Sequence, residues 1–298
     1  MAESAPLWWA LALPVVLALA ALAAASANAA LAAEPGPLRE SLRLLAQRRR
    51  RTNADDALLG RLGGVLLPTA AVLAAVVLPL GFRPVSDLSV GIVWFNAMEA
   101  LAWAAVWLAG WGPNSALSLI GGYRFLAQGL AYEVPHMLAI TTAALGAGSL
   151  RVGAVAQAQG GLWFAVWMPV AFAVYLLSAM AMAFWGPFGQ PVGRDVAGGA
   201  AGERAGADRL VFLGGRWLLL VVAAGMSVPL FLGGGHGPLL PAWCWTLLKT
   251  AAVLGLLLGL RRRLPAVRMD RFLELAWLVL TPLAVAQALV VAIVVLHR

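Results

Sequence analysis

Long apolar runs alternate with short polar segments along the whole chain. A transmembrane helix needs about 20 apolar residues to cross a hydrocarbon core of about 30 Å, and several runs reach this length. We therefore predict an all-α, polytopic membrane protein with about eight transmembrane helices. The expected spans cover approximately residues 7–33, 57–81, 89–111, 126–149, 161–184, 210–233, 241–260 and 271–296.

The first apolar run, residues 7–33, admits two interpretations. Its Ala-Asn-Ala and Ala-Leu-Ala tripeptides resemble the cleavage sites of signal peptides. However, the residues before it carry no basic side chain, and the run is longer than the apolar region of a signal peptide. We favour a retained first transmembrane helix, with a cleaved signal peptide as the alternative.

The composition excludes an ordinary soluble protein, because 62% of the 298 residues are hydrophobic and 11% are charged. We expect a single integral membrane domain over residues 1–298. Cys244 is the single cysteine, which excludes an internal disulfide and a multi-cysteine metal site. The three histidines, at positions 136, 236 and 297, lie too far apart in sequence for a local metal motif, so we expect no bound metal.

The net charge of +8 comes from 20 arginines and one lysine, which gather in loops instead of forming one binding face. This pattern argues against nucleic acid as a partner and fits membrane topology and anionic lipid headgroups. The odd-numbered loops hold most of the arginine, whereas the even-numbered loops hold only Arg83 and Arg151. By the positive-inside rule, the odd loops are cytoplasmic and both termini lie on the non-cytoplasmic side.

Two of the expected cytoplasmic loops have a distinctive composition. In residues 34–56, Leu38, Leu42 and Leu45 recur at helical spacing among arginines, which predicts an amphipathic helix in the membrane interface. The alternative is a solvated loop whose arginines only set the orientation. Residues 185–209 are rich in glycine, and we expect their later part, from position 197 to 206, to be flexible rather than packed.

Two motifs carry a resemblance to a known family. The run Tyr-Arg-Phe-Leu-Ala-Gln-Gly-Leu-Ala-Tyr-Glu, residues 123–133, resembles the signature of the H subunit of bacterial NADH–quinone oxidoreductase, the family of mitochondrial NADH dehydrogenase subunit 1. Near the end of the chain, residues 261–283 are similar to the closing loop and last helix of that family. Matching positions there are Pro265, Arg268, Asp270, Trp277 and Pro282. A weaker third match is Trp-Phe-Asn-Ala-Met-Glu, ending at Glu99, and the resemblance covers approximately residues 57–298.

The chain also departs from that family's pattern. Its first loop lacks the Glu-Arg-Arg start and the Gly-Pro-Asn-Arg segment, which implies that the quinone portal is rebuilt or absent. After Met182 the Pro-Phe-x-x-Pro skeleton is present at residues 187–191, but the acids and the arginine that the family carries around it are missing. The resemblance is therefore to a divergent, shortened member.

The resemblance implies that buried carboxylates couple quinone reduction to proton movement. An ionisable group inside a membrane is costly, and a nearby change of charge can load or unload its proton. Glu99 and Glu133 are the candidates for proton transfer, and Arg124 and Lys249 are the candidate counter-charges.

Simpler structural interpretations stand beside this one. Glu133 could pair with Arg124 at the interface and do nothing else. His136 follows Pro135 on the same helix, and a histidine that is hydrogen-bonded to a neighbouring helix is the favoured interpretation over a proton relay.

The resemblance also implies partners and a place for a ligand. No cofactor is expected on this chain itself, and a quinone would bind at its interface with a soluble-arm subunit. The partners implied are iron–sulfur and quinone-site subunits, small membrane subunits and antiporter-like subunits, in the cytoplasmic membrane of a bacterium. Weak candidates for the quinone or interface contacts are Gln128, Pro187, Phe188, Arg268 and Asp270.

Two functional hypotheses follow. The first is a membrane subunit that anchors the electron-transfer arm of a complex I-like enzyme and takes part in quinone-linked proton translocation. The second is a non-redox scaffold or ion-translocating subunit, including the kind found in membrane-bound hydrogenases, that has lost quinone chemistry. The missing acids after Met182 favour the second hypothesis, whereas Glu99, Glu133 and Lys249 favour the first.

Overall fold

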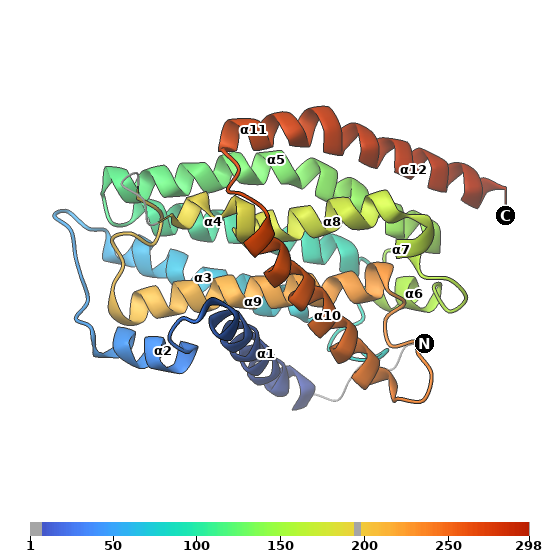
Figure 1. Ribbon diagram of the computed structural model, residues 1–298, viewed down its shortest axis with the longest axis horizontal. Coiled ribbons are helices and arrows are strands. Elements are labelled where there is room, and N and C mark those ends of the chain that lie inside the picture. Colours follow the sequence, from blue (N-terminus) through green and yellow to red (C-terminus); the bar gives the residue numbers. More distant parts are fainter. Residues whose placement is uncertain (1–7, 194–197, 298) are drawn as a thin grey trace.

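The computed structural model describes residues 8–193 and 198–297, and their regular structure is helical, with no strand among them. Most of the long helices run side by side along the longest axis, while α1 and α10 cross them obliquely (Figure 1). The elements are α1 (Trp8–Ala32), α2 (Pro37–Ala46), α3 (Ala57–Ala75), α4 (Gly91–Trp111), α5 (Ala116–Ala147), α6 (Val152–Gln157), α7 (Phe164–Trp167), α8 (Pro169–Met182), η1 (Gly186–Phe188), η2 (Gln190–Val192), α9 (Gly206–Phe231), α10 (Ala242–Arg263), α11 (Met269–Leu275), η3 (Ala276–Leu280) and α12 (Thr281–Leu296).

Seven helical segments of the described chain are long and apolar enough to cross a membrane, which confirms the all-α, polytopic class. The expected span at 126–149 is not among the seven, although the 32-residue helix α5 occupies that place. At 1.5 Å per residue α5 is about 48 Å long, enough to cross a bilayer. Arg124, Gln128 and Glu133 make it more polar than its neighbours. The orientation of the termini stays a prediction.

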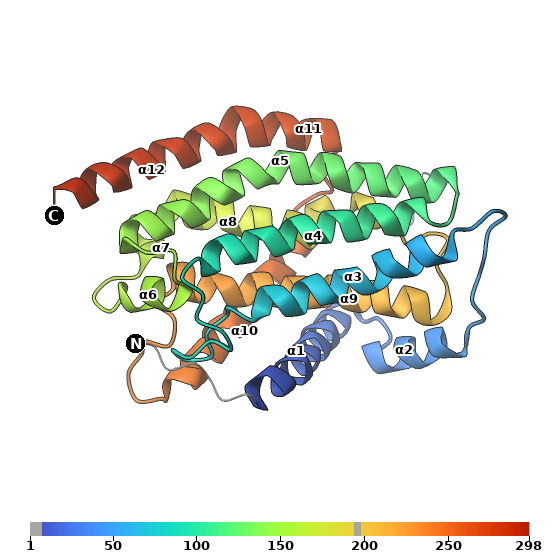
Figure 2. The same ribbon diagram turned by 180° about the vertical axis from the view of Figure 1, so that it is seen from behind.

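Helix α9 is the centre of the packing, because it contacts α1, α2, α3, α8 and α10. Seen from the other side, α3, α4 and α5 lie next to one another in sequence order (Figure 2), and α12 covers the outer side of α5. Ala102, Ala105 and Ala109 of α4 are completely buried in this packing. A Cβ added at Gly63 of α3 would lie 2.4 Å from the Ala109 nitrogen. Small residues therefore let α3 and α4 approach closely, as is usual between helices in membranes.

Helix α2 lies within the basic loop at residues 34–56 and packs against α9 and α1. Its Leu44 is buried, whereas Leu38, Leu42 and Leu45 are between 59% and 68% exposed. The leucines that set the helical spacing thus face away from the protein. Such a face suits a helix that lies in the membrane interface.

In the glycine-rich loop at residues 185–209, the described residues 198–206 are packed, in contrast to the flexibility expected there. Ala200 is fully buried, and its N–H donates to the Pro191 carbonyl over 2.9 Å. A Cβ added at Gly121 of α5 would lie 2.1 Å from the Ala200 nitrogen, so the loop backbone rests directly on α5. The prediction was wrong for residues 198–206 because small residues allow close backbone packing as well as flexibility. Residues 194–197 lie outside the described residues.

Candidate functional site

Glu99 of α4 and His136 of α5 form a buried acid–imidazole pair. Glu99 Oε1 lies 3.1 Å from His136 Nε2, and the two side chains are 1% and 0% exposed. An ionised carboxylate at this depth would be costly without such a partner. The neighbouring-helix contact favoured for His136 is thus present, and its partner is one of the two candidate proton-transfer acids.

Glu133 and Asn96 form a second pair across the same two helices. Asn96 Nδ2 donates to Glu133 Oε1 over 2.8 Å. Asn96 lies three residues before Glu99 on α4, and Glu133 lies three residues before His136 on α5. Residues three apart share one helix face, so α4 and α5 bring all four polar side chains into one cluster. Glu133 is partly exposed in this chain, whereas Glu99 and His136 are buried.

Aromatic side chains from α4, α5 and α8 surround this cluster. Trp103 Nε1 donates to the Tyr132 hydroxyl over 2.8 Å, and the Tyr132 ring stands edge-on to His136. Tyr175 of α8 lies with its ring centroid 5.2 Å from that of His136, and its hydroxyl donates to the Ala223 carbonyl of α9 over 2.7 Å. These rings keep the cluster in a low-dielectric environment, where charge interactions are strong.

Besides the Glu99 Oε1–His136 Nε2 contact, four buried polar atoms of the cluster make no hydrogen bond within the described part of the chain. They are Asn96 Oδ1, Glu99 Oε2, Glu133 Oε2 and His136 Nδ1. Buried polar groups are normally satisfied, and exceptions often mark a functional role. These atoms leave lone pairs and a ring nitrogen available for proton exchange.

Arg124 does not reach the acid cluster. It lies nine residues before Glu133 on α5, about 13.5 Å along the helix axis. Its Nη1 donates to the Gly198 carbonyl over 3.4 Å, and Glu133 is hydrogen-bonded to Asn96 instead. The predictions that Arg124 is the counter-charge of the acids, or a simple interface partner of Glu133, were therefore wrong. The spacing along one helix is too long for a direct contact.

Lys249 of α10 is also held away from the acids, in contrast to its expected role as their counter-charge. Its Nζ donates to the carbonyls of Leu232, Gly234 and His236 over 2.6, 3.0 and 2.8 Å. It also lies 4.5 Å from the ring centroid of Trp163. These carbonyls follow the C-terminal end of α9, where the helix dipole favours a cation. The ammonium group ties α10 to that end of α9.

The Pro-Phe-x-x-Pro segment at residues 187–191, before α9, contacts the closing loop and α11, which come after α10. Val267 N donates to the Pro187 carbonyl over 3.0 Å, and the Phe188 ring lies 4.4 Å from the Phe272 ring between centroids. The Pro-Phe-x-x-Pro segment thus packs against the closing loop that carries Arg268. The sequence could not show this contact, because about 75 residues separate the two segments.

The remaining interface candidates have different environments. Gln128 is buried and donates its Nε2 to the Ala181 carbonyl of α8 over 2.6 Å. Arg268 and Asp270 form an exposed ion pair with 3.2 Å between Nη2 and Oδ2. Gln128 therefore ties two helices together, whereas the charges of Arg268 and Asp270 face outward at the surface.

A large cavity that the sequence interpretation did not find lies between α1, α2 and α9. It has a volume of about 820 Å³. Alanines of α1 form much of one wall, and Trp185 contributes an aromatic wall with the guanidinium groups of Arg216 and Arg261 over its ring, 4.6 and 4.5 Å from the centroid. Arg216 was the available signal, since a charged residue inside an expected span often marks a functional cavity.

No group of three or more His, Cys, Asp or Glu residues in the described part of the chain could hold a metal ion.

Comparison with known proteins adds a family and several relatives. The sequence model of the NADH dehydrogenase family matches residues 36–292. The chain is 34% identical to the H subunit numbered 1 of the NADH-quinone oxidoreductase of Geobacter metallireducens, over 88% of this chain and 83% of the relative. It is also 34% identical to the H subunit numbered 2 of Geobacter sulfurreducens, over 85% and 80%. The H subunit numbered 2 of Cereibacter sphaeroides is 38% identical over 72% and 68%.

Proposed function

The chain belongs to the NADH dehydrogenase family, and on this premise we propose that it is the H-type membrane component of a complex I-like NADH–quinone oxidoreductase. In this role it anchors the electron-transfer arm in the cytoplasmic membrane of a bacterium. Its partners are iron–sulfur and quinone-site subunits on one side and antiporter-like membrane subunits on the other. The chain supplies membrane structure and proton-carrying groups, and other subunits carry the redox centres.

The observation that carries the proton-translocating part is the buried cluster of Glu99, His136, Glu133 and Asn96. Glu99 and His136 can hold one proton between Oε1 and Nε2, which are 3.1 Å apart. Glu133 is partly exposed as a residue, although its Oε2 is itself buried and makes no hydrogen bond within the described chain, so we assign it the outermost place in the proton path. A change of charge that reaches this cluster would shift the proton affinity of these acids.

The cavity between α1, α2 and α9 is the proposed route for a quinone. Its volume of about 820 Å³ lies within the usual range for small-molecule sites. Helix α2 lines the cavity with Leu44 and exposes its other leucines, as expected of a helix in the membrane interface, next to the lipid in which a hydrophobic quinone would dissolve. Reducing a quinone to a quinol takes two electrons and two protons. The chain's part is to admit the ring and to place Arg216 and Trp185 beside it.

The alternative is a non-redox scaffold or ion-translocating subunit, of the kind that membrane-bound hydrogenases also use. One observation favours it. The segment after Met182, which lacks the family's acids, is filled by Phe184, Trp185 and Phe188, all nearly fully buried. Residues 183–192 thus hold no acidic side chain that proton transfer to the quinone region would use.

Copurification in mild detergent separates the two functions. The tagged full-length chain is expected to bring down iron–sulfur and quinone-site subunits in stoichiometric amounts, identified by mass spectrometry. The complex is then expected to reduce quinone with NADH. Recovery of only antiporter-like or unrelated membrane proteins would overturn the respiratory function and support the alternative.

A further inference from the structure

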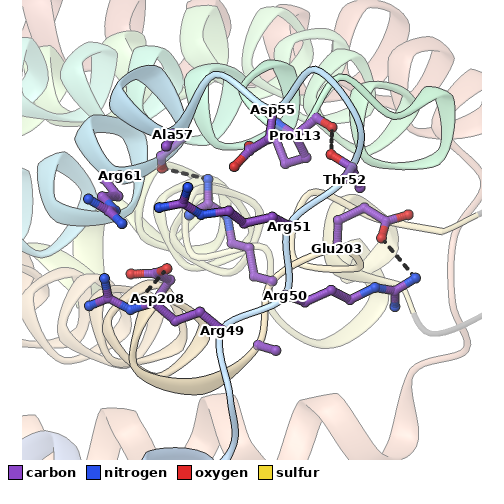
Figure 3. Close-up of a pocket in the computed structure, with 13 residues that line it drawn as sticks. Arg49, Arg50, Arg51, Thr52, Asp55, Ala57, Arg61, Pro113, Glu203 and Asp208 are labelled. Atoms are coloured by element: carbon purple, nitrogen blue, oxygen red, sulfur yellow. Dashed lines mark hydrogen bonds and ion pairs between the residues drawn. The ribbon is translucent and has the colours of Figure 1, made fainter.

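A compact basic pocket lies at the ends of three helices, away from the acid cluster and the large cavity. It is formed where α3 begins, α4 ends and α9 begins, and it has a volume of about 40 Å³. Figure 3 shows the Arg51 side chain reaching across this pocket, with the guanidinium group of Arg49 beside Asp208. The loop at residues 34–56 supplies most of its positive side chains.

The charges of the pocket do not cancel within the described chain. Arg49 pairs with Asp208 over 3.7 Å, and Arg50 pairs with Glu203 over 3.3 Å. Among the other lining residues, Arg51, Arg61 and Arg204 carry positive charge, and only Asp55 carries negative charge. The lining side chains thus carry a net charge of +2, with the Asp56 carboxylate next to them at the start of α3.

Arg204 forms the floor of the pocket and is only 7% exposed. Its Nη2 donates to the carbonyls of Gly60 and Ala109 over 2.7 and 2.9 Å, which fixes the guanidinium plane. Its Nε is buried and makes no hydrogen bond to any described residue. Burial lowers the pKa of Arg204, and Asp208 and Asp55 partly oppose this shift. A buried donor on a fixed arginine is a group that a bound anion would satisfy.

One helix N-terminus adds to the positive potential. Ala205 precedes α9 and lines the pocket, and no side chain caps this helix end. The N-terminal end of a helix carries partial positive charge and free N–H groups, which favour phosphate. The start of α3 is different, because the Asp56 carboxylate already accepts hydrogen bonds from the Leu58 and Leu59 N–H groups. Because α3 and α9 are also membrane-spanning candidates, their N-terminal ends would reach the headgroup region of a bilayer, where lipid phosphates lie.

We propose that this pocket binds a single phosphate group, recognised by Arg51, Arg61 and Arg204. The volume of about 40 Å³ corresponds to a few water molecules, so it suits one phosphate and excludes a nucleotide. The forked guanidinium groups of arginine match phosphate oxygens. The phosphate belongs either to a lipid headgroup or to a free phosphate ion. This site is independent of the proposed redox function.

The test measures binding of two radiolabelled probes to the delipidated full-length chain in detergent. One probe is inorganic phosphate and the other is phosphatidylglycerol, each against chloride at equal ionic strength. The double variant Arg51→Gln/Arg61→Gln is expected to bind at least one probe about tenfold more weakly, because charge-assisted hydrogen bonds are lost. Saturable binding of free phosphate identifies the ion as the source, and saturable binding of the lipid alone identifies the headgroup.

The matched control is Arg39→Gln/Arg263→Gln, which removes two charges from exposed positions outside the pocket. It is expected to bind within about twofold of the native chain, because exposed charges contribute little. Asp55→Asn removes the pocket's remaining acid and is expected to tighten binding several-fold. Equal losses in both double variants, no binding above chloride, or weaker binding by Asp55→Asn would each overturn the proposal. Absence of binding to the chain alone, with an acidic partner protein covering Arg51 and Arg61, would also overturn it.

Discussion

At the scale of single residues, the spacing of polar groups on two facing helices builds the proton-carrying cluster. Asn96 and Glu99 on α4 meet Glu133 and His136 on α5, each pair three residues apart. Each acid therefore receives one neutral or basic partner from the opposite helix. Arg124 takes no part, because its place on α5 is more than two turns away from Glu133.

Glu133→Gln tests this cluster directly. The amide keeps the size of the side chain and its contact with Asn96 but holds no exchangeable acid proton. We expect the complex to assemble with its partners and to lose proton pumping, measured in membrane vesicles with a fluorescent pH probe. Glu274→Gln is the matched control, since Glu274 is exposed and pairs with Arg271. Unchanged pumping by Glu133→Gln would remove Glu133 from the mechanism.

At the scale of secondary-structure elements, close backbone contacts hold the loops and helices together. The segment at 198–206 rests on α5 where Gly121 has no side chain. The same closeness joins α3 to α4 at Gly63. Helices in membranes gain most of their association energy from such packing, because lipid offers no hydrophobic driving force between them.

Gly121→Ala is expected to destabilise the chain by about 1–3 kcal/mol, because the new Cβ would press on the backbone at Ala200 and force the loop off α5. The measurement is the thermal unfolding midpoint in detergent. Gly255→Ala is the control: a Cβ there meets nothing within 4 Å on α10. It is expected to be neutral or to stabilise by roughly 0.5–1 kcal/mol. Equal midpoints for the two variants would contradict the close-packing account.

At the scale of the whole molecule, α1 and α10 cross the bundle obliquely (Figure 1), and the large cavity is lined by α1, α2 and α9 together with Trp185 and Arg261. The bundle of α3, α4, α5 and α8 holds the acid cluster, so the proposed quinone route and the proton-carrying groups lie in different parts of the fold. Two features link these parts: α9 contacts both α1 and α8, and Trp185 of the cavity wall follows the end of α8 by three residues.

Gly214→Trp tests the role of the cavity. Gly214 lines it, and a Cβ there meets nothing within 4 Å, so the indole would project into open space without straining the helix. In the assembled complex we expect a higher KM for quinone with normal assembly. Gly259→Trp, at another open position outside the cavity lining, is expected to leave the KM unchanged. A normal KM in Gly214→Trp would exclude this cavity as the route.

The sequence by itself determined the fold class and nearly all of the spans, because the thickness of a bilayer fixes the length of an apolar helix. It also identified the family through residues 123–133 and 261–283, and it selected Glu99 and Glu133, since an acid in an apolar helix is rare enough to be a signal. The side of the membrane on which the termini lie rests on the arginine distribution and stays a prediction.

Only the tertiary structure decided which polar groups meet. Nothing in the sequence order pairs Glu99 with His136, because that contact depends on how α4 packs against α5. The three carbonyls around Lys249 could not be predicted either, since every residue has a carbonyl and only the backbone path after α9 turns these toward one point. The basic pocket and the large cavity arise for the same reason: their walls come from segments far apart in the chain, and only packing brings them together.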